Sequence, residues 1–146
     1  MKQYIYNLVL LGIILGISLD SVAQNIEDQK ISSFIVSQNL VPLLTNKKDN
    51  PVLRFQIPIF TQESQMLTAM DLNIAGTISI SEIKTLRIYY CGINPIVTTK
   101  NLFAEMKPIT GQMHLVGKQL LAKGNNYFWV CAELNSDASL LHTILV

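Results

Sequence analysis

Apolar and polar residues alternate with a period of two from Pro51 onward, which is the spacing of side chains on the two faces of a β-strand. The alternation runs through residues 53–59, 70–74 and 86–90, and glycine, proline or polar clusters interrupt it. No stretch after Leu19 keeps a 3.6-residue period. The pattern therefore predicts a chain of strands joined by turns.

The clearest strand signal lies in residues 127–134, which follow the turn-forming run Lys123–Asn126. The stretch is rich in aromatic residues and apolar on both faces until Glu133, as expected of a central strand covered on both sides. Residues 79–83 predict at most one helical turn, with Ser81 as its cap. Residues 26–38 are mixed and polar, with one apolar cluster at Ile31 and 34–36, and predict a lead-in that joins an edge strand. Weaker strand signals lie at 41–44 (an edge strand, because of Pro42), and at 102–104, 113–116 and 140–146.

About seven or eight short strands, with a turn signal roughly every ten residues, predict an all-β fold. We expect a single antiparallel β-sandwich or jelly-roll-like domain, for which 146 residues leave room. The last strand, 140–146, is apolar up to the final residue, whereas domains usually end in a few polar residues. This ending fits a domain that is cut short at its C-terminus.

The N-terminal region has the pattern of a secretory signal peptide. Lys2 precedes an apolar run from Leu8 to Leu19, and Ser21 and Ala23 are the small residues that a signal peptidase accepts. The run is shorter than the roughly 18 residues of a membrane span, and an uncleaved anchor is the alternative. We predict cleavage after Ala23, export to the periplasm, cell surface or medium, and a mature domain (24–146) without a membrane span.

The charge of the chain gives no sign of a nucleic-acid partner. Loss of residues 1–23 removes Lys2 and Asp20, so the mature domain keeps the formal net charge of +1. A near-neutral domain lacks the basic surface that binds phosphates. Its glycines stand singly at turns, and no phosphate-binding loop or Gly-x-Ser-x-Gly nucleophile motif occurs.

Residues suited to metal binding or catalysis are sparse. His114 and His142 have no second ligand at a metal-binding spacing, so we predict no metal and no cofactor. Asp71 and Glu133 are the strand carboxylates that a glycosidase mechanism would need as a pair. We interpret both as ordinary outward-facing carboxylates, although Glu133 shares a strand face with Tyr127 and Trp129 and would line a groove with them.

Cys91 and Cys131 are the two cysteines of the chain, and both fall in expected strands. In an exported protein such a pair often forms a disulfide. The alternative is two separate buried thiols that pack as small apolar groups. The sequence leaves both open, because it does not give the Cα separation that a disulfide needs.

The aromatic residues allow two interpretations. Trp129 lies in the most apolar strand, which favours a core position. Alternatively, Trp129, Tyr127 and Tyr89, with Glu133 beside them, form an exposed platform for the apolar face of a sugar.

Several segments resemble the N-terminal domain that precedes the catalytic propeller in sialidases of Bacteroides relatives. The most distinctive is Gly124–Val130, with its Asn-Tyr-Phe-Trp motif after a glycine turn; the others are 65–67, 72–74, 83–90 and the strand–turn–strand region 41–59. The resemblance covers residues 31–146.

The resemblance implies a β-sandwich placed before a six-bladed propeller that acts as an exo-α-sialidase on sialylated glycans. Such a propeller uses three arginines to hold the sialate carboxylate, together with Ser-x-Asp-x-Gly-x-Thr-Trp boxes. This chain has only Arg54 and Arg87 and no such box, so we expect it not to be an enzyme itself.

Two functions from different classes follow. The first is a non-catalytic accessory domain, carbohydrate-binding-like or structural, whose partners are the C-terminal catalytic propeller and sialoglycans. The second is a stand-alone exported adhesion or assembly module that uses the apolar strand 140–146 as its edge.

Overall fold

The computed structural model describes residues 33–74 and 79–139, which belong to one compact unit, 31–146. The predicted signal peptide and the predicted strand 140–146 lie outside the described residues. In the described part, no helix has the length and hydropathy that a bilayer crossing requires.

The described chain is almost entirely antiparallel β-structure, which confirms the all-β prediction. Its elements are β1 (Ile35–Gln38), β2 (Asn50–Ile59), β3 (Gln65–Asn73), the 3₁₀ turn η1 (Ile80–Glu82), β4 (Ile83–Tyr90), β5 (Leu102–Met106), β6 (Gln112–Leu121) and β7 (Gly124–Leu134). Five strands form a sheet in the order β1-β2-β7-β4-β5, and β3 pairs with β6 in a second sheet. β7 is therefore the central strand of the larger sheet, as its sequence predicts.

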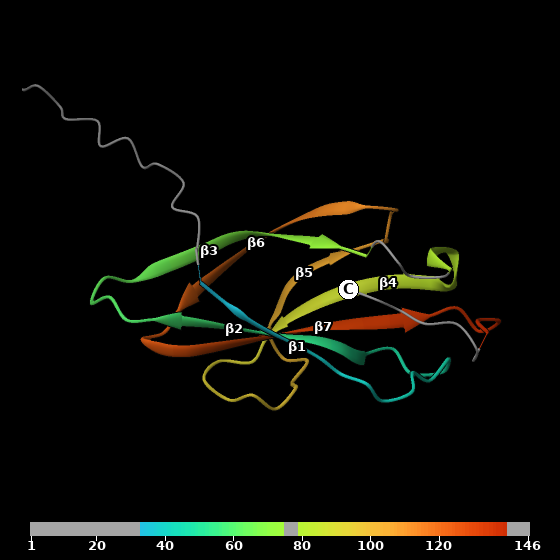
Figure 1. Cartoon of the computed structure of the whole chain (residues 1–146), viewed down its shortest axis with the longest axis horizontal. Helices are drawn as coiled ribbons and strands as arrows, with labels where there is room; N and C mark the ends of the chain where they lie inside the picture. The colour runs from blue at the N-terminus through green and yellow to red at the C-terminus, as the bar shows by residue number, and fades with distance from the viewer. Residues whose placement is uncertain (1–32, 75–78, 140–146) are drawn as a thin grey trace, which may run out of the picture. The chain divides into compact units, whose positions relative to one another are not determined.

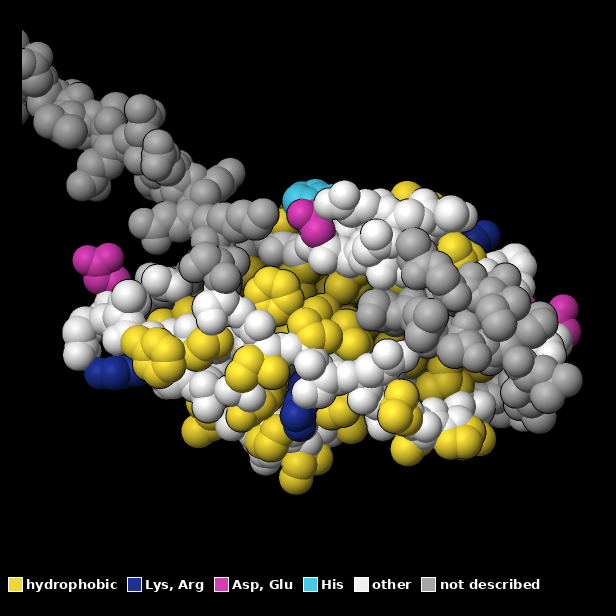
Figure 2. All heavy atoms as spheres, viewed as in Figure 1, with side chains coloured by type: hydrophobic (Ala, Val, Ile, Leu, Met, Phe, Trp, Pro, Cys, Tyr) yellow, Lys and Arg dark blue, Asp and Glu magenta, His cyan; other side chains and the backbone are white. Residues whose placement is uncertain are grey.

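The two sheets share one apolar core. Alternate residues of β2, β4 and β7 meet alternate residues of β3 and β6 in a single buried cluster. Phe128 is fully buried at its centre, with the rings of Tyr90 and Phe103 at centroid distances of 5.0 and 5.6 Å. In Figure 1, β3 and β6 form one layer over the other strands, and Figure 2 shows hydrophobic side chains between the layers. The fold is a two-layer β-sandwich.

Two local predictions are wrong. Residues 41–44 form a loop and not a strand, because the backbone groups of Leu44 bond to the side chain of Asn50: Leu44 N–H donates to Asn50 Oδ1, and Asn50 Nδ2 donates to the Leu44 carbonyl, both at 2.9 Å. Ser81 lies inside η1 and does not cap it. The residue before the turn is Ser79, whose side chain makes no capping hydrogen bond.

Candidate functional site

The face of the five-stranded sheet that points away from the core, which we call the outer face, carries most of the chemically active side chains. In β7, Phe128, Val130 and Ala132 enter the core, so Tyr127 and Trp129 project to the opposite side. Both remain partly exposed. The interpretation of Trp129 as a core residue is therefore wrong, because the core takes the other set of alternating residues of the same strand.

Arg54 joins these two aromatic rings in a small group that we call the Trp129 cluster (Arg54, Tyr127, Trp129). Arg54 is the register partner of Trp129 across β2 and β7. Its guanidinium carbon lies 5.8 Å from the centroid of the Tyr127 ring and 5.9 Å from that of Trp129, which is the range of a cation–π contact. Trp129 Nε1 donates a hydrogen bond of 2.8 Å to the carbonyl of Pro95, so the β4–β5 loop (91–101) lies beside the cluster.

Arg87 organises the other part of the outer face. Its side chain is only 7% exposed and contacts three carboxylates: Glu105 at 2.6 Å, Glu133 at 2.7 Å and Asp49 at 3.5 Å. It also donates to the carbonyl of Lys48 at 3.2 Å, which ties the loop before β2 to the sheet. Burial alone would lower the pKa of Arg87, but the hydrogen bonds to Glu133 and Glu105 outweigh it and raise this pKa. The guanidinium is a permanent buried cation.

Tyr89 lies next to Trp129 on β4 but is covered. Its side chain is buried, and its hydroxyl donates a hydrogen bond of 2.9 Å to Asp49 Oδ1. Burial first, and this hydrogen bond second, raise the pKa of Tyr89 above its ordinary value. The phenol therefore supports the strand beneath Trp129 and leaves little of its ring to a ligand.

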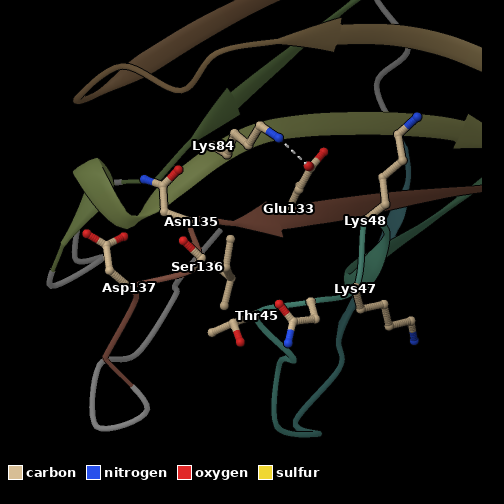
Figure 3. A pocket seen from close by; sticks show the side chains of 10 residues that line it. Thr45, Lys47, Lys48, Lys84, Glu133, Asn135, Ser136 and Asp137 are labelled. Carbon is tan, nitrogen blue, oxygen red and sulfur yellow. Dashed lines mark hydrogen bonds and ion pairs between the residues drawn. The ribbon is translucent and has the colours of Figure 1, made fainter.

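Glu133 lies beside a polar groove of about 710 Å³ at the far end of β7 (Figure 3). In Figure 3, Lys84 points toward Glu133, and Asn135–Asp137 lie across from Thr45. Lys84 Nζ donates to Oε1 at 2.8 Å and Arg87 to Oε2 at 2.7 Å, so both carboxylate oxygens are engaged. These hydrogen bonds, that of Lys84 foremost, lower the pKa of Glu133. The arrangement suits a fixed ion pair and not a catalytic acid.

The two cysteines are free buried thiols, the second of the alternatives left open by the sequence. Cys91 N–H donates to the carbonyl of Tyr127 on β7, so Cys91 lies beside Tyr127. Cys131 is four residues after Tyr127 on the same strand and pairs with Arg87. At about 3.3 Å per residue this offset is far beyond the Cα separation of a disulfide. Burial raises the pKa of the Cys131 thiol to about 12. A thiol of this kind is a packing group and not a nucleophile.

The second sheet carries the remaining candidates. Asp71 is exposed on β3, as predicted, and its Oδ1 lies 2.8 Å from Nδ1 of His114 on β6. His142 lies outside the described residues. Within the described ranges, no three His, Cys, Asp or Glu side chains gather as metal ligands.

The importance of the two arginines was not predicted from the sequence. The sequence indicates that both arginines face away from the core, since Arg54 and Arg87 alternate with the core residues of their own strands. It does not indicate that Arg87 is paired with carboxylates, because Asp49 and Glu105 are 38 and 18 residues away from it in the chain.

Comparisons with known proteins identify relatives of this sandwich. The family model described as the N-terminal domain of BNR-repeat neuraminidase matches residues 31–146. A sialidase of Bacteroides fragilis (strain YCH46) is 25% identical over 138 residues, which cover 77% of this chain and 25% of that protein. The solved structure of Hadza microbial sialidase Hz136 superposes with a TM-score of 0.64 at 21% identity, covering 75% of this chain and 26% of that chain. The chain thus spans about a quarter of the length of these relatives.

Proposed function

Because the chain belongs to the family of N-terminal domains of BNR-repeat neuraminidases, we propose that it is a non-catalytic accessory domain of an exported exo-α-sialidase that acts on sialylated glycans. Its partner in the whole protein is a C-terminal catalytic propeller. The signal-peptide pattern of residues 1–23 supports export. Both carboxylate oxygens of Glu133 are held in ion pairs, with Lys84 and Arg87, which supports a non-catalytic role for this domain.

We propose that the outer face binds a glycan and that Trp129 and Tyr127 contact it. The observation that carries this assignment is their position: two neighbouring aromatic rings project from a central strand to the side away from the core and stay partly exposed. Aromatic faces pack against the C–H faces of sugars, and polar neighbours orient the hydroxyl groups. Tyr89 and Glu133 support this face from β4 and from the end of β7.

We expect Trp129→Ala to weaken glycan binding at least about tenfold, since a tenfold change corresponds to about 1.4 kcal/mol and a lost stacking contact is of that size. A glycan array, followed by titration calorimetry with a sialylated and a galactosylated oligosaccharide, measures the effect. Phe60→Ala is the matched control, because Phe60 is an aromatic residue that is 79% exposed outside the outer face.

Reproducible binding that Trp129→Ala removes and Phe60→Ala leaves intact supports the assignment. Equal binding by both variants would place the glycan elsewhere. Urea midpoints of both variants show whether the loss of the Trp129–Pro95 hydrogen bond disturbs the fold.

A structural role is the second candidate, favoured by the β4–β5 loop. Ile93 and Ile96 are both 70% exposed in that loop, beside Trp129. Exposed apolar side chains grouped in this way are typical of a surface that packs on another domain. In this role the sandwich is a folded spacer that rests on the propeller. A chain that binds no glycan on the array favours this candidate over glycan binding.

A further inference from the structure

The chain has two arginines, and their surroundings on the outer face are opposite. Arg87 is buried and contacts three carboxylates. The side-chain hydrogen bond of Arg54 goes to the hydroxyl of Ser37, at 3.4 Å. Among residues 33–74 and 79–139, no carboxylate lies within ion-pair distance of Arg54. Arg54 is therefore a cation whose charge the described part of the domain does not neutralise.

The position of Arg54 is nevertheless well defined. Its guanidinium contacts the rings of Tyr127 and Trp129 at nearly equal distances of 5.8 and 5.9 Å. Trp129 is itself held by its hydrogen bond to Pro95, and Tyr127 faces Gln56 across the β2–β7 ladder. Holding a charged side chain in one place before binding reduces the conformational entropy that binding must overcome. The cluster thus presents a fixed guanidinium next to two aromatic rings.

These groups define the ligand by chemistry. A guanidinium offers parallel N–H donors that match the two oxygens of a carboxylate. Aromatic rings next to it favour a ligand that also has an apolar C–H face. Sugars that bear a carboxylate combine the two features, whereas neutral sugars have only the second.

We propose that Arg54 makes the Trp129 cluster selective for carboxylate-bearing sugars, by pairing its guanidinium with the sugar carboxylate while Tyr127 and Trp129 contact the ring. This inference rests on the proposed function, because it names the glycan class that the same surface takes. It gives a role to the one arginine that the carboxylates of the described domain leave free.

The test measures the affinity of the purified chain for 3′-sialyllactose and for lactose, which differ by the carboxylate-bearing sugar. The chain is expected to bind sialyllactose at least about tenfold more tightly, and the preference should fall as salt screens the ion pair. Arg54→Gln should remove the preference and leave lactose binding within about twofold. Arg54→Lys should keep part of it, because an ammonium group pairs with a carboxylate without the bidentate geometry.

Lys118→Gln is the control for net charge, because Lys118 is an exposed cation on β6, in the other sheet. This variant should keep the full preference. Equal affinities for the two sugars in the unchanged protein, or a preference that survives Arg54→Gln, would overturn the inference and leave glycan binding standing. Loss of lactose binding in Arg54→Gln would also overturn it, since Arg54 would then act by holding the rings. A protein that binds neither sugar contradicts both the inference and the assignment of a glycan to the outer face.

Discussion

Replacing Arg87 by alanine is expected to lower the free energy of unfolding by about 3 kcal/mol, a large effect for a single charged residue. The side chain is 7% exposed, and its removal leaves Glu105, Glu133 and Asp49 close together without their common cation. Removing one partner of a buried ion pair leaves uncompensated charge, which typically costs about 3–5 kcal/mol. We expect the lower end of that range because Glu105 is 46% exposed and can be solvated.

Urea unfolding of the purified chain measures this loss, with Arg54→Ala as the matched control. Both variants remove an arginine from the outer face, but Arg54 has no carboxylate partner among the described residues. Arg54→Ala should therefore change the unfolding free energy by less than about 1 kcal/mol. Arg87→Lys should fall between, because lysine restores the charge but not the three directed contacts. Equal losses for Arg54→Ala and Arg87→Ala would contradict the role given to Arg87.

Asn126→Ala is expected to lower the free energy of unfolding by about 2–4 kcal/mol, because several buried polar groups depend on this side chain. Its Oδ1 accepts hydrogen bonds of 2.8 Å from both the Tyr90 hydroxyl and the Ala122 N–H. Its Nδ2 donates to the carbonyls of Ala122 at 2.8 Å and Gly124 at 3.1 Å. The amide thus closes the β6–β7 turn and also satisfies a hydroxyl group in the core.

The neighbouring residue supplies the control for this variant. Asn125 has the same side chain but is exposed, so Asn125→Ala should change stability by no more than about 0.5 kcal/mol. Comparing the two urea midpoints separates the buried hydrogen bonds from any general preference of the turn for asparagine. A cost for Asn126→Ala as small as that for Asn125→Ala would show that the turn does not depend on this amide.

The alternation of apolar residues predicts most of the strands and the central place of β7, but not which face of β7 enters the core. Both faces of β7 carry large side chains with apolar surface: Tyr127 and Trp129 on one side, Phe128 and Val130 on the other. A period of two says that the two sets face opposite ways and nothing more. The face of β7 that packs against the second sheet is the one that enters the core, and this packing joins segments that are distant in the sequence. The same limit explains residues 41–44, where the side chain of Asn50 takes up the backbone groups of a predicted strand.

The sequence indicates that Tyr127 and Trp129 share a strand face, but it does not indicate how the charged residues around them are arranged. The period of two predicts that Trp129 and Tyr127 are neighbours on one strand face, and the structure confirms this. The loop that carries Asp49 closes over Tyr89 and Arg87, which no local pattern indicates. This loop buries Tyr89, which the sequence predicts as part of an exposed platform. Long-range ion pairs leave no periodic signal in a sequence, so the difference between the two arginines emerges only in the folded chain.

The function that we propose requires the outer face of the five-stranded sheet to hold a sialylated glycan without cleaving it. Amide chemical shifts in ¹⁵N–¹H spectra of the chain, recorded during a titration with 3′-sialyllactose, test this claim most directly. We predict shifts that gather at Arg54, Tyr127, Trp129 and the adjoining 91–101 loop, with the trisaccharide intact at the end. Shifts confined to Asp71 and His114 on the other sheet, or release of free sialic acid by the chain alone, would contradict it.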